Sequence, residues 1–211
     1  MKMVWRFISL MGLILIGIIC SAGGENQDYF PLKAGGTWIY NLEEAGATKN
    51  MEYTITDVLE EKGEKLYHVE IRLNGIPVRR EYYSLCRNGV LYVMAQQQMY
   101  KFRYEPRRVF LKYPVKHRKR WTQQGMISDP DYGVQYTYDL LCEYRDAGKI
   151  TVPAGSFEAV RLFMVYDTSD GAKIDSILYL SSGVGIIKEE RKTEINGKIT
   201  FGTRVLIYYH L

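Results

Sequence analysis

The residues best suited to bind a ligand form a basic segment between Lys101 and Arg120. Nine of its side chains are lysine or arginine, Glu105 is its only acid, and aromatic residues are interleaved with them. Such a segment is suited to electrostatic binding of an anionic membrane surface or an envelope polymer. The alternative is a solvated hairpin and edge strand whose charges prevent edge-to-edge pairing. The candidate residues for the anionic-surface role are Arg107, Arg108, Lys112, Lys116, Arg118, Lys119 and Arg120.

Tyrosine offers a second kind of recognition chemistry. The chain contains 18 tyrosines, and each combines an apolar ring with a polar tip, which suits a cavity for a lipid-like or apolar ligand. Ordinary core packing is the simpler interpretation of the same residues. The candidate apolar face consists of Tyr53, Ile55, Tyr136, Tyr138 and Leu140.

Residue types that serve in catalysis or metal binding lack the required spacing. Ser156 lies in a turn sequence without the Gly-x-Ser-x-Gly spacing of a hydrolase nucleophile. The three histidines, His68, His117 and His210, are scattered rather than set at zinc-ligand spacing. The segment 129–133 lacks the oxygen ligands that an EF-hand needs further along. We therefore expect no catalytic residue, no metal site and no cofactor, and hence no enzyme.

The N-terminus has the pattern of an export signal. Two basic residues precede an apolar run over residues 7–19, and small residues follow it. This pattern predicts a secretory signal peptide over residues 1–22, since the run falls short of the ~20 residues that a bilayer span needs. Lipid anchoring at Cys20 is the alternative, disfavoured because Ile19 is large where lipidation signals carry a small residue. We expect a periplasmic or extracellular protein, for which nucleic acid is a poor partner.

Residues 23–211 suit a single domain that contains two cysteines, Cys86 and Cys142. In an oxidising compartment these two could form a disulfide, but pairing requires a proximity that sequence does not show. Cys142 falls on the apolar side of its predicted strand, which favours free, buried thiols. Both alternatives stay open at this point.

The rest of the sequence is typical of antiparallel strands. Apolar and polar residues alternate over 134–143, and Asn-Gly pairs at 74–75, 88–89 and 196–197 separate β-forming runs. Alternation with period two indicates a strand with one buried face, and Asn-Gly is the strongest short signal for a hairpin. Residues 51–59 predict another such strand, with Leu59 on its buried face. We predict an all-β antiparallel meander, with few or no helices, that forms a curved sheet or partial barrel.

The two halves of the chain resemble each other. Segments 30–38 and 113–121 both read aromatic, Pro, aliphatic, Lys, four residues, Trp, and the same offset relates 52–54 to 135–137. After a loop insertion the correspondence continues from 89–91 to 185–187. An internal duplication explains this pattern. We therefore predict two related halves, about 29–112 and 113–211, that close over a shared core.

Three segments together carry a resemblance to a known family: Phe30–Trp38, Val152–Phe157 and Tyr179–Gly185. On these the chain resembles the TapB-like family of bacterial exported proteins, a domain-of-unknown-function group related to LolA and LolB lipoprotein-carrier folds. The resemblance implies a curved β-sheet or partial barrel in the cell envelope and brings no catalytic residue with it. The chain departs from the pattern at residues 117–120, where the second half lacks the glycines of the first.

These observations favour a non-catalytic binding or carrier module for a lipid-like or apolar ligand. The alternative is a structural or assembly subunit that contacts envelope protein or polymer through its sheet edge and basic segment. An enclosed cavity would favour the first function, and an open hydrophobic sheet edge would favour the second.

Overall fold

The chain folds into a ring of antiparallel strands. A computed structural model describes residues 28–61 and 63–211. The predicted signal peptide over residues 1–22 and the anchoring position Cys20 lie outside these residues. The strands are β1 (Thr37–Glu44), β2 (Ala47–Glu61), β3 (Glu64–Leu73), β4 (Ile76–Cys86), β5 (Gly89–Gln97), β6 (Tyr100–Lys112), β7 (Arg120–Asp129), β8 (Val134–Val152), β9 (Gly155–Thr168), β10 (Lys173–Ser181), β11 (Gly185–Ile195) and β12 (Lys198–His210).

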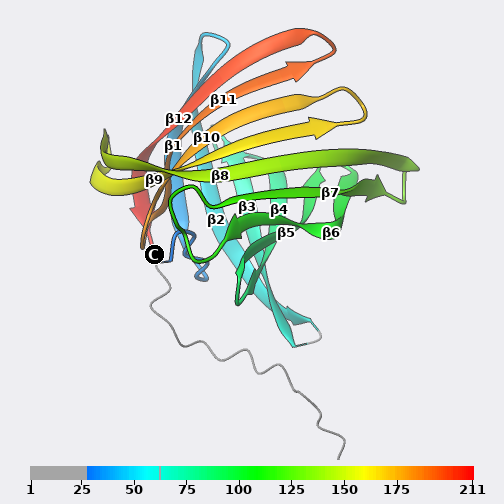
Figure 1. The fold of residues 1–211 in the computed structure, drawn as a ribbon, viewed down its shortest axis with the longest axis horizontal. Helices are drawn as coiled ribbons and strands as arrows, with labels where there is room; N and C mark the ends of the chain where they lie inside the picture. Colours follow the sequence, from blue (N-terminus) through cyan, green and yellow to red (C-terminus); the bar gives the residue numbers. More distant parts are fainter. Residues whose placement is uncertain (1–27, 62) are drawn as a thin grey trace, which may run out of the picture.

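Each strand pairs with the next, and β12 returns to pair with β1, so the ring is a closed barrel (Figure 1). The prediction of an all-β antiparallel meander is confirmed, and the barrel is closed rather than partial. The closing ladder runs from Thr37 opposite His210 to Glu44 opposite Gly202. Closure depends on the accumulated twist and stagger of all the strands. The alternation of apolar and polar residues within one strand carries no information about either quantity.

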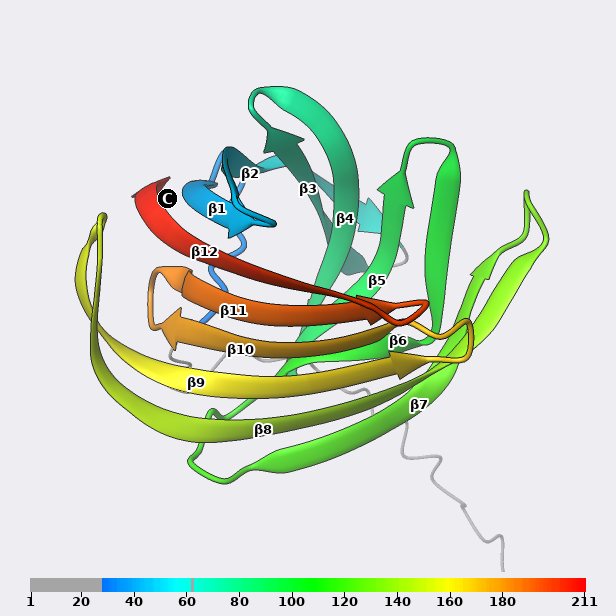
Figure 2. The same ribbon diagram turned by 90° about the horizontal axis from the view of Figure 1, so that it is seen from above.

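The barrel has two walls with different strand directions. In Figure 2, β8–β11 lie side by side as one broad curved wall, while β3–β5 stand across it. The inward side chains form an aromatic core, in which Tyr92, Tyr138 and Tyr144 are each 1% exposed. Neighbouring rings meet edge to face, as between Tyr92 and Tyr104, whose centroids lie 5.1 Å apart. Such contacts add to the free energy gained by burying the rings.

A β-bulge changes which residues of β2 face inward. The register against β3 shifts between Ile55 and Asp57, and one extra residue in a strand moves every later side chain to the opposite face. Ile55 is accordingly buried, whereas Leu59 is 45% exposed and Val58 packs against the core instead. The prediction that Leu59 shares the buried face of this strand was therefore wrong.

Each predicted half supplies six strands, with the boundary falling between β6 and β7. Trp38 and Trp121 lie near the starts of β1 and β7, and Gly89 and Gly185 begin β5 and β11. The segments that match in sequence thus occupy corresponding strands. The duplication itself stays a prediction.

The two halves meet at two ladders, β1–β12 and β6–β7, and the second of these is short. Only three residue pairs join β6 to β7, from Arg103 opposite Ser128 to Glu105 opposite Met126. Beyond these pairs, the Gln123 side chain of β7 bonds the backbone of β6 in place of a ladder. Its Oε1 accepts from the Val109 amide at 2.7 Å, and its Nε2 donates to the Arg107 carbonyl at 2.9 Å. A side chain here satisfies backbone groups that a neighbouring strand satisfies elsewhere in the ring.

Candidate functional site

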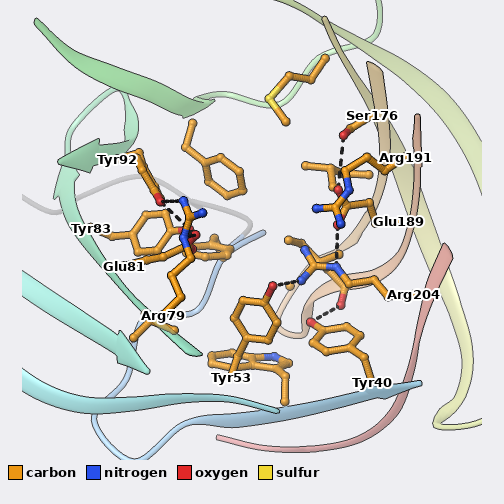
Figure 3. A pocket seen from close by; sticks show the side chains of 18 of the residues that line it. Tyr40, Tyr53, Arg79, Glu81, Tyr83, Tyr92, Ser176, Glu189, Arg191 and Arg204 are labelled. Carbon is orange, nitrogen blue, oxygen red and sulfur yellow. Dashed lines mark hydrogen bonds and ion pairs between the residues drawn. The ribbon is translucent and has the colours of Figure 1, made fainter. Parts of the chain in front are cut away.

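The barrel interior contains a cavity of about 200 Å³. Both halves of the chain contribute to its lining (Figure 3). Aromatic and aliphatic side chains cover part of the surface, and ionisable side chains cover the rest. The charged residues are Arg79, Arg108, Arg191, Arg204, Glu81 and Glu189. Burying a charge costs free energy unless it is paired, so we expect each of these groups to have a partner of opposite charge or a hydrogen-bond partner.

On one side of the cavity, β4 presents three polar residues in alternate positions, Arg79, Glu81 and Tyr83. The period of a strand places all three on the same face. The Glu81 carboxylate accepts from the Tyr83 hydroxyl at 2.6 Å and the Tyr92 hydroxyl at 2.9 Å, and the Arg79 Nε lies 2.9 Å away. Burial raises the pKa of Glu81, but Arg79 and the two hydroxyls outweigh it and hold that pKa below its usual range. Glu81 therefore stays ionised, and its carboxylate is engaged by Arg79 and the two tyrosine hydroxyls.

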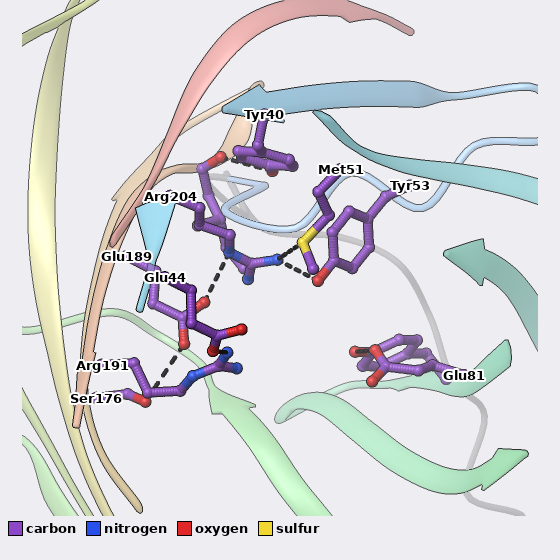
Figure 4. Close-up of polar contacts among 11 residues, drawn as sticks. Tyr40, Glu44, Met51, Tyr53, Glu81, Ser176, Glu189, Arg191 and Arg204 are labelled. Atoms are coloured by element: carbon purple, nitrogen blue, oxygen red, sulfur yellow. Dashed lines mark hydrogen bonds and ion pairs between the residues drawn. The ribbon is translucent and has the colours of Figure 1, made fainter. Parts of the chain in front are cut away.

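A second cluster lies across the cavity, where Arg204 of β12 stands directly opposite Glu189 of β11. Arg204 Nε is 2.6 Å from Glu189 Oε2, and both side chains are 10% exposed. Arg204 also donates to the Tyr53 hydroxyl, and Ser176 bonds the other oxygen of Glu189 at 3.3 Å (Figure 4). This is a buried ion pair with its remaining hydrogen-bonding capacity largely satisfied.

The apolar part of the lining is a wall of packed rings. The Phe30 ring lies 5.1 Å from those of both Tyr83 and Phe110, measured between centroids. Trp38 donates to the Val184 carbonyl at 2.6 Å, which joins β1 to the turn before β11. Ring contacts within the first half and the bond from Trp38 to the second half thus fix the wall, which presents apolar surface to the cavity.

The residues of the predicted apolar face all belong to the barrel interior. Ile55, Tyr138 and Leu140 are buried in the core, and Tyr136 packs against it with partial exposure. Of the five, Tyr53 alone lines the cavity. The other four pack in or against the core outside the cavity lining.

The basic segment is divided between two sides of the barrel. Arg107 is exposed and pairs with Glu64, whereas the next residue, Arg108, lines the cavity. Neighbouring residues of a strand point to opposite faces, which explains the division. Lys119 donates to the Tyr113 carbonyl at 2.6 Å. Exposed basic side chains remain at Lys112, Lys116, Arg118 and Arg120, near the connection from β6 to β7. Their binding to an anionic surface stays a prediction.

Both cysteines are free thiols. Cys142 is fully buried, and Cys86 is half-buried with its thiol 3.4 Å from the Gly89 carbonyl. This arrangement corresponds to the unpaired alternative that the position of Cys142 favoured.

Sequence reasoning missed the buried arginine and glutamate residues. Their signal was present, since Arg79, Glu81 and Tyr83 occupy every second position of one strand and so share a face. Glu189 lines the cavity, whereas the next residue, Glu190, lies on the outer face. The partner of Glu189 is Arg204 on the neighbouring strand, and register alone reveals it.

We expect the protein to lose stability at alkaline pH. Burial raises the pKa of Tyr138 from 10.0 to about 12 and that of Cys142 from 9.0 to about 12. A raised pKa in the folded state means that the unfolded chain releases these protons first. The stabilisation is complete below pH 9 and declines above it, by about 2–3 kcal/mol at pH 10.5. Urea unfolding at pH 8 and 10.5 measures the difference, and Cys142→Ala should reduce it; an unchanged urea midpoint in the native protein would contradict the expectation.

Comparison with known proteins locates the fold but not a family. No family model and no curated protein matches this chain. A candidate lipoprotein of Parabacteroides distasonis ATCC 8503 has a similar structure, with a TM-score of 0.54 and 14% identity over 89% of this chain and 100% of that one. The two chains share a fold. The TapB-like family stays a prediction.

Two further structures match with lower scores. One is a candidate exported protein with a YmcC-like fold from Bacteroides fragilis NCTC 9343, with a TM-score of 0.45, 12% identity and coverage of 87% of this chain and 99% of that one. The other is the hypothetical lipoprotein YmcC from Escherichia coli (K12), with a TM-score of 0.37, 10% identity and coverage of 86% of each chain.

Among the described residues, no helix is long and apolar enough to cross a membrane. The described residues also contain no group of three or more His, Cys, Asp or Glu side chains that could hold a metal ion.

Proposed function

We propose that this chain is a non-catalytic binding protein of the cell envelope that holds a small amphiphilic ligand inside its barrel. The observation that carries the proposal is the interior cavity of about 200 Å³, in which an aromatic wall faces a polar one. A cavity with an apolar lining and a few fixed polar groups is the usual form of a small-molecule site.

The size and lining of the cavity define the ligand class. Ligand cavities commonly measure about 300–1,000 Å³, so this one suits a single short chain or ring rather than a two-chain lipid. The apolar body of the ligand would contact the wall that includes Phe30, Leu32, Trp38, Phe110 and Ile186. Its polar end would lie among the arginines.

Export of the chain is part of the proposal. The N-terminal sequence pattern supports it, as does the description of the similar Parabacteroides protein as a candidate lipoprotein. The assembly alternative has less support, because the described strands form a closed ring and only the short β6–β7 ladder leaves backbone that another chain could extend.

Filling the cavity should abolish binding. Ile174 of β10 lines the cavity, and its tryptophan variant, Ile174→Trp, places a larger ring in the space that the ligand needs. We expect calorimetric titration with 1-octanol to show binding to the native protein and an affinity at least about tenfold lower for the variant, a loss of 1.4 kcal/mol or more. Native mass spectrometry of protein from its own cells would identify any natural ligand.

A control variant lies on the same strand. Ile177 lines a groove on the outer face of the barrel, formed with Val165 and Phe201, so Ile177→Trp adds the same ring without entering the cavity. This variant should bind 1-octanol as the native protein does. Equal binding to all three proteins would place the probe elsewhere and refute the proposal.

A further inference from the structure

Arg108 differs from the other arginines of the cavity because it has no partner of opposite charge. It lies on β6 across from Tyr92, and its Cζ is 4.4 Å from the ring centroid of Tyr92, 5.1 Å from that of Tyr104 and 5.3 Å from that of Tyr166. Its Nε is buried and has no hydrogen-bond partner, although the residue as a whole keeps intermediate exposure. Arg108 therefore contacts ring faces while its Nε–H donor stays unused.

The remaining charges around the cavity are matched in pairs. Arg79 pairs with Glu81, Arg204 with Glu189, and Arg191 with Glu44 at 3.4 Å. Four guanidinium groups thus stand against three carboxylates, and the fourth is Arg108. Arg108 also attracts the Glu81 carboxylate electrostatically, but Glu81 already accepts bonds from Tyr83 and Tyr92 and pairs with Arg79. One positive charge remains without a carboxylate.

Aromatic rings compensate this charge only in part. A desolvated cation over a tyrosine face gains about 2 kcal/mol, less than the cost of removing an ion from water. A guanidinium that contacts rings through its flat face keeps its in-plane N–H groups free for a carboxylate. The Tyr166 hydroxyl, which lines the same cavity, is also buried without a hydrogen-bond partner of ordinary geometry. The Arg108 Nε is thus an unused donor, and the neighbouring Tyr166 hydroxyl, which interacts with Tyr104, can turn toward a ligand.

We propose that Arg108 and the Tyr166 hydroxyl bind the acidic group of the ligand, and that the ligand is a small amphiphilic monocarboxylate. This inference rests on the proposed function and specifies its substrate class. A single negative charge neutralises the one unmatched guanidinium, and two carboxylate oxygens suit one guanidinium and one hydroxyl. A phosphate monoester brings nearly two charges and would leave one of them unmatched.

The test compares two probes that differ only in the acidic group, octanoate and 1-octanol, by calorimetric titration at pH 7. The native protein should bind octanoate at least about tenfold more tightly than 1-octanol. Arg108→Met, an apolar variant of similar length, should weaken octanoate at least about 30-fold and 1-octanol, whose hydroxyl carries no charge, by no more than about threefold. Tyr166→Phe should weaken octanoate by about three- to tenfold through the loss of one hydrogen bond.

The control is Arg107→Met, because Arg107 adjoins Arg108 but lies outside the barrel and pairs with Glu64. It should leave the affinity for octanoate unchanged. Should Arg108→Met not fold, Arg108→Lys keeps the charge but removes the planar fork, and must weaken octanoate more than 1-octanol. If 1-octanol binds and octanoate binds equally to the native protein and Arg108→Met, this inference is wrong while the proposed function stands. If neither probe binds the native protein, the proposed function fails and this inference fails with it.

Discussion

Replacing Glu189 by leucine should lower the free energy of unfolding by about 3–5 kcal/mol, because a buried ion pair that loses one member leaves an uncompensated charge. Arg204 and Glu189 are each 10% exposed and 2.6 Å apart, so water does little to solvate the remaining guanidinium. Tyr53 alone cannot replace the carboxylate, since a neutral hydroxyl carries no opposite charge. Urea unfolding of Glu189→Leu measures the loss.

Two variants separate this effect from a general loss of a glutamate. Glu190 follows Glu189 in the chain, points to the outer face and pairs with Lys188, its own side chain being 40% exposed. Glu190→Leu should therefore change stability by no more than about 1 kcal/mol. Adding Arg204→Met to Glu189→Leu should restore most of the stability, because an apolar pair leaves no buried charge. Equal costs for the two leucine variants would show that the buried pair contributes nothing.

Replacing Gly89 by alanine is expected to destabilise the barrel by about 3 kcal/mol or more, through backbone strain and a steric clash. A Cβ at this position would lie 1.9 Å from the Leu111 carbonyl oxygen, and φ is +153°. The atom in the way belongs to the backbone of β6, so no rotamer change relieves the contact. The β5–β6 ladder would have to shift, which the urea midpoint of Gly89→Ala should report.

Gly75→Ala provides the comparison, because Gly75 also has a positive φ, +80°, but a Cβ there meets nothing within 4 Å. This variant carries only the conformational cost of about 1–2 kcal/mol. The difference between the two variants isolates the clash. If both cost the same, the close approach of β5 and β6 at this point is not a constraint on the fold.

The sequence predicted what local pattern determines. Alternation over residues 134–143 located β8, and the Asn-Gly pairs lie at the turns between β3 and β4, β4 and β5, and β11 and β12. These features depend on neighbours within a few residues, and the side-chain period of a strand is fixed by geometry.

The sequence did not reveal the features that depend on the pairing register between neighbouring strands. Arg107 and Arg108 looked equivalent in a run of basic residues, yet one faces solvent and the other the cavity. The partner of Glu189 is fifteen residues away on another strand, and the bulge after Ile55 moved Leu59 outward. Each outcome depends on which residue stands opposite on the next strand, and a shift of one position changes it.

The ladder between β1 and β12 also constrains the order of folding. Its partners, such as Thr37 and His210, are separated by almost the whole described chain, and contacts so remote in sequence form late because a long loop must first lose its freedom. A chain that is still being synthesised lacks β12, the strand that closes the barrel. Until the last 13-residue strand arrives, two unpaired borders remain open to other chains, so the interval before completion is when this protein is most prone to self-association.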